Sequence, residues 1–355
     1  MKKCLAIIII CIFLLEGCAF SPGRQNGDEG QDAPETTVIR LALNDSGHIF
    51  NSIAFAQGFL AQEGITVEYV HVDTDAEVFE GLKNGTIDIA SNSGTNLPLQ
   101  EISSGLDLTI FAGYLIAGCM PIFSRVETPY SGIGDFIGST MACEPNVYAI
   151  TGPLLDMGYD PLREISWYDP EDQRDRIEAV RNGDADFALV GTALNYEVLS
   201  DPELKILTYA DDILPNYSCC RVEALTSWVN ENPNTVKALL RAWIRAMEYY
   251  DTHHDETVVF TVQQTGMPEE VVRAYLDNPR FKLNIDPMKS AVLRAWDYMD
   301  RLGLLDNDAK KIDINDHINT YLYKQALDEC QERYGSDNPA FYEKLQAQYA
   351  RNNAP

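Results

Sequence analysis

Small and hydroxyl residues that could bind a polar ligand occur twice in this chain, each time after the same run of residues. Residues 77–98 read EVFEGLKNGTIDIASNSGTNLP, and residues 175–196 read DRIEAVRNGDADFALVGTALNY. Each copy predicts a helix that ends at Asn-Gly, because glycine accepts the left-handed conformation that closes a helix. A short apolar strand follows, and then a loop of small residues at 92–95 or 191–193. Such loops place hydroxyls and backbone N–H groups at helix N-termini, where they can bind a ligand.

The two copies share their charged, capping and strand residues at matching positions. Coincidence is the alternative, because Asn-Gly closes many helices. Since the caps, one aspartate and the following loop recur together, a duplicated unit is favoured, which predicts two similar lobes with two similar rims. The matched pairs are Glu80 and Glu178, Lys83 and Arg181, Asn84 and Asn182, Gly85 and Gly183, Asp88 and Asp186, and Ala90 and Ala188.

Helical and strand patterns alternate over the first two thirds of the chain. This alternation predicts a largely parallel sheet, whose ligands bind beyond the carboxyl ends of the strands. From residue 224 the pattern is almost wholly helical, with Pro233, Pro268 and Pro287 expected at first helical positions. The expected strands are 38–43, 65–72, 87–91, 108–112, 139–142, 165–168, 185–190 and 206–209, with an extended segment at 215–222. The expected helices include 50–62, 75–83, 147–157 and 172–181, and later 233–251, 255–265, 268–276, 287–302, 314–333 and 339–351.

Composition excludes some functions and bounds the size of the protein. A chain of 355 residues, 45% of them hydrophobic, can form a large core, and its length favours two domains. Its 54 acidic residues against 27 basic ones argue against nucleic-acid binding, which needs a basic surface, and suit a soluble monomer. Five of the eight cysteines lie after residue 100, none of them with CxxC spacing, so no metal site or cofactor is expected. Buried free thiols are the expectation, and one disulfide is the alternative.

The N-terminus has the features of a targeting segment. Lys2 and Lys3 precede twelve apolar residues at 4–15, too few to span a bilayer, which takes about 20. Leu15-Glu16-Gly17-Cys18 resembles a bacterial lipoprotein signal, in which the cysteine is acylated, although Glu16 replaces the usual small residue. Residues 1–17 are therefore expected to be a signal peptide and 18–37 a flexible tether; an ordinary secretory signal is the alternative.

Five segments resemble one family, the solute-binding lipoproteins of ABC importers in the nitrate/sulfonate/taurine and thiamine-pyrimidine-precursor group. Their order and spacing are specific together, although no single motif is unique, and the similarity covers about residues 38–330. The segments are residues 48–64 followed by ITVEY, GLKNGTIDIASNSG, DFIGSTM at 135–141, MGYDP at 157–161, and TSWVNENPNTVKALLRAWIRAMEYY at 226–250.

The resemblance implies an α/β periplasmic-binding-protein fold of the second type, with two lobes, two crossings between them and a mostly helical C-terminal part. Lobe one would comprise residues 38–124 and 222–355, and lobe two residues 125–221. Closure of the lobes on a ligand would present the loaded protein to the ABC permease. It also implies an extracytoplasmic protein that the lipid anchors to the bacterial membrane.

The expected ligand-binding residues lie in the strand-exit loops and at the second crossing, and no catalytic residue is expected. They are Gly47, His48, Phe50, Ser93, Gly94, Thr95, Tyr114, Glu144, Asn146, Tyr148, Gly191, Thr192, Tyr217 and Arg221.

Each of these residues has an alternative role in the structure. His48, Ser93 and Thr95 are also suited to capping helices. The tyrosines at 114 and 148 are equally suited to the core, Glu144 to a solvated turn, and Arg221 to a surface pair with Glu223.

The ligand's charge and the function class leave alternatives. Asp45 and Glu144 would repel an anion from a closing cleft, which favours a neutral or cationic nitrogen-containing ligand, such as a pyrimidine, over nitrate or a sulfonate. Other classes are an enzyme of pyrimidine-precursor synthesis, an adhesion module and a ligand-sensing lipoprotein. The chain lacks GxSxG, HExxH and GxxxxGK motifs, and the only adjacent late cysteines are Cys219 and Cys220, which argues against an enzyme.

Acylation of Cys18 is tested by Cys18→Ala. The variant is expected to stay unprocessed or to be released from membranes, because no thiol remains to accept the lipid. Mass spectrometry of the mature protein checks this, and a wild-type protein that keeps residues 1–17 without lipid contradicts it.

Overall fold

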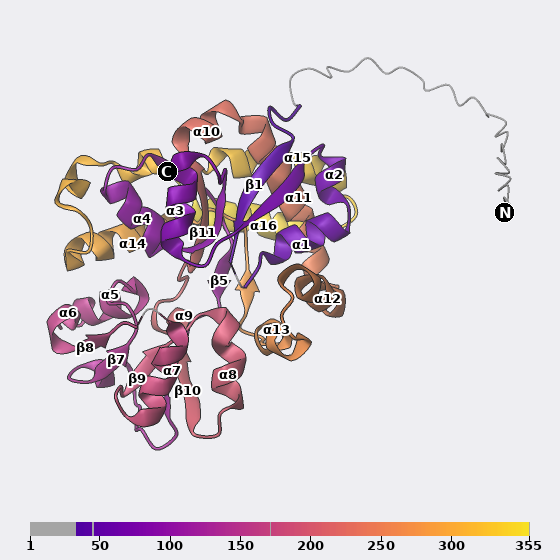
Figure 1. Cartoon of the computed structure of the whole chain (residues 1–355). Helices are drawn as coiled ribbons and strands as arrows, with labels where there is room; N and C mark the ends of the chain where they lie inside the picture. The colour runs from indigo at the N-terminus through magenta and orange to yellow at the C-terminus, as the bar shows by residue number, and fades with distance from the viewer. Residues whose placement is uncertain (1–32, 45, 171, 355) are drawn as a thin grey trace, which may run out of the picture. The chain divides into compact units, whose positions relative to one another are not determined.

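The computed structural model describes residues 33–44, 46–170 and 172–354. Residues 34–355 form one compact unit (Figure 1). Cys18, the predicted signal peptide and Asp45 lie outside the described residues. None of the described helices is both long and apolar enough to cross a membrane.

Two sheets form the cores of two lobes, and they have the same strand order. The strands of the first lobe follow the order β2-β1-β3-β11-β4, in which a parallel bridge between Leu41 and Ile89 connects β1 to the segment leading into β3. The strands of the second lobe follow the order β8-β7-β9-β6-β10. The first set comprises β1 (Val38–Leu43), β2 (Thr66–His71), β3 (Ala90–Gly94), β4 (Leu108–Gly113) and β11 (Cys220–Leu225). The second comprises β6 (Pro121–Arg125), β7 (Thr140–Ala142), β8 (Ser166–Tyr168), β9 (Phe187–Leu189) and β10 (Leu204–Tyr209).

The prediction of a largely parallel sheet was wrong in one respect. β11 runs antiparallel to both β3 and β4, and β6 runs antiparallel to both β9 and β10. Each antiparallel strand follows a crossing from the other lobe, so its direction is set by where the chain enters the sheet. The first crossing lies between β5 (Leu115–Ala117) and β6, and the second precedes β11. β5 also pairs with β12 (Lys282–Leu283).

Helices pack around both sheets, and Figure 1 shows α5 to α9 grouped around the second. The helices before the first crossing and after the second are α1 (Ile49–Ala56), α2 (Phe59–Gln62), α3 (Asp75–Asn84), α4 (Asn96–Ser103), α10 (Thr226–Glu231), α11 (Pro233–Tyr250), α12 (His254–Thr265), α13 (Glu269–Leu276), α14 (Lys289–Leu302), α15 (Tyr321–Tyr334) and α16 (Pro339–Asn352). Those between the crossings are α5 (Tyr148–Asp156), α6 (Pro161–Glu164), α7 (Gln173–Asn182), α8 (Asn195–Ser200) and α9 (Ala210–Ile213). α13 packs against α8, and α14 packs against α5. Short 3-10 turns occur at Ile133–Phe136, Thr192–Leu194, Asn307–Lys311 and Ile314–His317.

The repeated aspartate connects two strands in each lobe. Asp88 Oδ2 accepts a hydrogen bond from Arg40 N at 2.7 Å, at the start of β1. Asp186 Oδ2 accepts one from Thr140 N at 2.9 Å, at the start of β7. The backbone N–H of each aspartate donates back to the carbonyl of the same partner. The carboxylate therefore satisfies a strand-edge donor that the sheet ladder leaves unpaired.

The rest of the repeat also has the same structure in both lobes. Gly85 and Gly183 close α3 and α7 with φ of 75° and 82°. Lys83 pairs with Glu80 and with Glu101 on α4, while Arg181 pairs with Glu178 and with Asp201, directly after α8. The duplicated segment is thus a duplicated structural unit: a helix, a glycine cap, a strand and an ion pair to the next helix.

Several predicted boundaries were wrong. The first helix divides into α1 and α2, because Gly58 adopts φ 70° between them. β3 begins at Ala90 instead of residue 87, so Ser93 and Gly94 lie in a strand that pairs with β11 and not in a loop. Pro233 is the first residue of α11 as expected, but α13 and α14 begin after Pro268 and Pro287. The end of the expected tether is also fixed, since Thr235 N donates to Glu35 Oε2 at 2.9 Å.

The aspartate bond is tested by Asp88→Ala. The variant is expected to lower the free energy of unfolding by about 1–3 kcal/mol, because the part-buried N–H and the guanidinium of Arg40 both lose the Asp88 carboxylate as acceptor. Asp184→Ala is the matched control: its side chain is exposed, and a change within about 0.5 kcal/mol is expected. Urea unfolding measures both, and equal losses would contradict the assigned role.

Candidate functional site

Side chains from both lobes meet at the second crossing. Thr95 Oγ1, at the exit of β3, donates to the carbonyl oxygen of Ser218 and lies 3.2 Å from that of Cys219. Tyr148 Oη, on α5 of the other lobe, donates to the same Ser218 carbonyl at 3.1 Å. Tyr217 is buried beside Tyr148, with ring centroids 5.2 Å apart, and its hydroxyl lies 3.3 Å from Met120 Sδ. Three of the expected residues thus come together here, around a serine that the sequence analysis did not select.

His48 caps α1, as its alternative role anticipates. Its Nδ1 accepts from Asn51 N at 3.2 Å, and its ring stacks between Tyr114 at 4.2 Å and Trp243 at 4.5 Å. Tyr114 Oη accepts from Ile49 N at 2.8 Å. Burial lowers the pKa of His48 to about 3. The imidazole is therefore neutral at physiological pH, and its Nε2 has no partner among the described residues.

Gly47 and Phe50 lie in the packing around this stack. Phe50 is fully buried, and its ring contacts Tyr114 edge-on with centroids 6.1 Å apart. Gly47 has φ 70°, and a Cβ there would lie 2.6 Å from Thr265 on α12. These contacts give both residues structural roles at the exit of β1.

Glu144 forms ion pairs within its own lobe. Its Oε1 accepts from Arg176 Nη2 at 2.6 Å, and the same nitrogen donates to Asp169 at 3.0 Å. Arg176 is buried, whereas the Glu144 side chain is 38% exposed. Because a buried guanidinium balances it, Glu144 repels an anion less than the sequence analysis assumes.

Asn146 and Asp75 each lie close to a residue of the other lobe. Asn146 Nδ2 donates to Gln100 Oε1 on α4 at 3.1 Å, which connects the lobes, while Asn146 Oδ1 is buried without a partner among the described residues. Asp75, at the start of α3, has its pKa raised by burial and by the charge of Glu144. The Asp75 side chain is nevertheless exposed.

The alternative role of Arg221, a surface pair with Glu223, is contradicted, because both residues are fully buried on β11. Arg221 Nη1 donates to the Pro287 carbonyl at 2.9 Å, while Nε and Nη2 have no partner among the described residues. The Glu223 carboxylate has the Ser93 hydroxyl of β3 as its hydrogen-bonding neighbour. Burial raises the pKa of Glu223 well above its ordinary range, although Ser93 and Arg221 lower it.

The remaining expected residues lie on the facing strands and in the second-lobe loop. Ser93 and Gly94 are paired with Arg221 and Cys220 in the sheet. Gly191 N donates to Gln173 Oε1 at 2.7 Å. Thr192 is half-buried at the start of a 3-10 turn and has no described side-chain hydrogen bond. Thr192 is therefore available to a ligand, whereas Thr95 is occupied by the crossing.

Three buried cysteines lie on the two crossings between the lobes. Cys119 on the first crossing and Cys219 and Cys220 on the second are free thiols, as expected. Cys219 Sγ lies 3.4 Å from Cys220 Sγ, and burial raises the pKa of the Cys119 thiol. No group of three or more His, Cys, Asp or Glu side chains in the described part of the chain could hold a metal ion.

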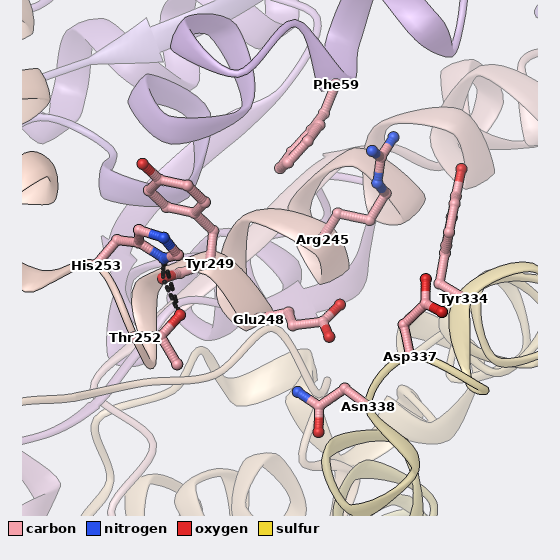
Figure 2. Close-up of a pocket in the computed structure, with 9 residues that line it drawn as sticks. All are labelled: Phe59, Arg245, Glu248, Tyr249, Thr252, His253, Tyr334, Asp337 and Asn338. Atoms are coloured by element: carbon pink, nitrogen blue, oxygen red, sulfur yellow. Dashed lines mark hydrogen bonds between the residues drawn. The ribbon is translucent and has the colours of Figure 1, made fainter.

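Two open surface cavities lie away from these residues. One of about 340 Å³ is shown in Figure 2, where Tyr249 stacks on His253 at 3.9 Å and Arg245 lies between Phe59 and Tyr334. The other, of about 500 Å³, is lined by residues of α8, β10 and α13. Neither contains a residue expected to bind the ligand.

Residues 45–257 match the model of the family described as NMT1/THI5 like. A putative aliphatic sulfonates-binding protein of Bacillus subtilis is 24% identical over 343 residues, which are 93% of this chain and 98% of that protein. The periplasmic nitrate-binding protein of Synechocystis has a similar fold, with TM-score 0.67, 18% identity and coverage of 86% of this chain and 91% of that one. A desulfurization enzyme also shares the fold, with TM-score 0.56, 13% identity and coverage of 83% and 99%.

The buried His48 predicts acid sensitivity. In the unfolded chain His48 takes up a proton near pH 6.5, whereas in the folded protein its pKa is about 3. The free energy of unfolding therefore falls as the pH drops from about 6.5 towards 3. Between pH 7 and 5, His48→Asn should lose about 2 kcal/mol less unfolding free energy than the wild type.

Urea unfolding at each pH measures the difference. Asparagine can still cap α1, and exposed His71→Asn is the control that should keep the wild-type dependence. An unchanged pH dependence in His48→Asn would contradict the assignment.

Proposed function

Because this chain belongs to the family of NMT1/THI5-like proteins, we propose that it is the extracytoplasmic solute-binding component of an ABC importer. The observation that carries the proposal is the meeting of Thr95 and Tyr148, from two lobes of equal strand order, at Ser218 on the segment that joins the lobes. A solute bound beside this point touches both lobes and the hinge. Its binding energy can therefore favour the closed form.

The proposal includes the partners and location that this role requires. The protein is a monomer. It captures a small nitrogen- or sulfur-containing solute and delivers it to the permease subunits. Acylated Cys18 anchors it to the bacterial membrane. We further propose two lobes close to the bounds expected from the sequence, with β6 (Pro121–Arg125) assigned to the second lobe and all of β11 (Cys220–Leu225) to the first.

The chemistry of the described groups supports binding over catalysis. A nucleophilic cysteine needs a lowered pKa, but burial raises the pKa of Cys119 and of Cys143. A catalytic base needs a pKa near the working pH, and that of His48 is about 3. These groups are suited to packing. The fold alone does not decide between the roles, since an enzyme also has it.

A thermal-shift screen with sulfonates, nitrate, pyrimidines, amines and amino acids tests the function. A bound solute should raise the melting temperature, because it stabilises only the native state. Thr192→Val should weaken the binding of that solute by about 1–3 kcal/mol without changing the melting temperature of the ligand-free protein.

Thr95→Val is the matched control. It should lower the melting temperature of the ligand-free protein, because Thr95 bonds the crossing and not the solvent. Failure of every compound class to shift melting, together with an unchanged radius of gyration in small-angle scattering, would overturn the proposed function.

A further inference from the structure

One face of α14 carries polar side chains that reach the second crossing and the second lobe. Arg294, Tyr298 and Arg301 are spaced by four and three residues, so they lie on the same side of the helix. α14 packs against α4 and α16 of the first lobe and against α5 of the second (Figure 1). The helix therefore lies where the two lobes meet.

Two residues of this face bind one carboxylate at the C-terminal end of α5. Tyr298 Oη donates to Asp156 Oδ2 at 2.7 Å, and Arg301 Nη2 donates to Asp156 Oδ1 at 2.7 Å. These bonds lower the pKa of Asp156, so the carboxylate is charged at physiological pH. Because hydrogen bonds to a charged acceptor are stronger than neutral ones, Asp156 attaches the end of α5 firmly to α14.

The two helices also pack so closely that their contact needs a glycine. A Cβ at Gly152 of α5 would lie 2.5 Å from Cγ of the Tyr298 ring. The ring therefore lies directly on the α5 backbone, one turn before Asp156. A side chain at position 152 would have to displace the ring, and α14 with it, because packed interiors have no spare room for a methyl group.

The third residue of this face binds the segment that joins the lobes. Arg294 Nη2 donates to the carbonyl oxygens of Pro215 and Asn216, both at 2.9 Å. Tyr148, at the start of α5, also bonds this segment, through the carbonyl of Ser218. Asp156 is eight residues further along α5, which is about 12 Å. The bonds to Asp156 therefore act at a distance from the crossing, where a rotation of the second lobe moves α5 most.

We propose that Arg294, Tyr298 and Arg301 of α14 form a latch that holds the second lobe against the first when no solute is bound. Separation of the lobes must break both bonds to Asp156, so the latch raises the ratio of closed to open protein. Its effect on solute capture rests on the proposed solute-binding function. The apparent affinity follows the closed fraction, because only the closed form encloses a solute.

Small-angle scattering of the ligand-free protein tests the latch. Asp156→Asn keeps the size of the side chain and removes its charge, so it should increase the radius of gyration over that of the wild type. A two-state fit should give a closed-to-open ratio at least about threefold lower. Asp160→Asn is the matched control. Its exposed carboxylate pairs with Arg163 inside the second lobe, and the radius should not change.

Gly152→Ala tests the same contact without removing a charge. The added methyl group should separate α5 from α14 and increase the radius of gyration, while far-UV circular dichroism stays that of the wild type. This variant also decides the matter if Asp156→Asn does not fold. Adding Arg301→Gln to Asp156→Asn should open the protein little further, because both changes remove the same bond.

Several results would overturn the latch. They are folded Asp156→Asn and Gly152→Ala proteins with the wild-type radius, a wild type that is already as expanded as they are, or an equal expansion of Asp160→Asn. A thermal-shift screen without any ligand overturns the solute-binding role and leaves the scattering result standing. With a solute in hand, its dissociation constant should rise in Asp156→Asn by the factor by which the closed fraction falls. Unchanged affinity in an expanded variant would contradict the effect on solute capture.

Discussion

The structure depends on one exchange of strands between the lobes. β6 completes the second sheet directly after the first crossing, and β11 completes the first sheet directly after the second. Each of these strands lies between two strands of the sheet it enters and runs opposite to both of them. The crossing segments are therefore anchored at the sheet interior, where hydrogen-bond ladders resist slippage.

This exchange also explains where the polar groups gather. The exit of β3 lies beside the entry of β11, so Thr95 reaches the carbonyl of Ser218 and β11 carries Arg221 and Glu223 inward. Tyr148 reaches the same carbonyl from the second lobe. Because the second crossing lies beside the strand exits of both lobes, a solute bound here would contact the segment that joins them.

The duplicated unit could be predicted from the sequence because its signals are local. The Asn-Gly cap, the apolar run and the aspartate between them can be recognised without reference to the rest of the chain. Both copies form the expected helix and glycine cap. The bounds of β1 were confirmed in full, since VIRLAL is an uninterrupted strand pattern. The start of β3 was wrong because its register is decided by β11, more than 100 residues later. Long-range pairing of this kind has no local signature.

The roles of single polar residues were harder to predict. A histidine before a helix can cap it or bind a ligand, and the hydrogen bond from Asn51 N to its Nδ1 shows that His48 caps. An Arg-x-Glu pattern suits an exposed strand as well as a buried one. Burial of Arg221 and Glu223 follows from the central place of β11, which becomes visible only when both crossings are traced.

The place of β11 also decides the chemistry of its charged side chains. β11 lies between β3 and β4, and both Arg221 and Glu223 on it are fully buried. Burial raises the pKa of Glu223 well above its ordinary range, while the Ser93 hydroxyl on β3 and the charge of Arg221 lower it. Arg221 donates to the carbonyl oxygens of Asp286 and Pro287, directly before α14. The strand that follows the second crossing is therefore held by β3, by β4 and by the C-terminal part of the chain.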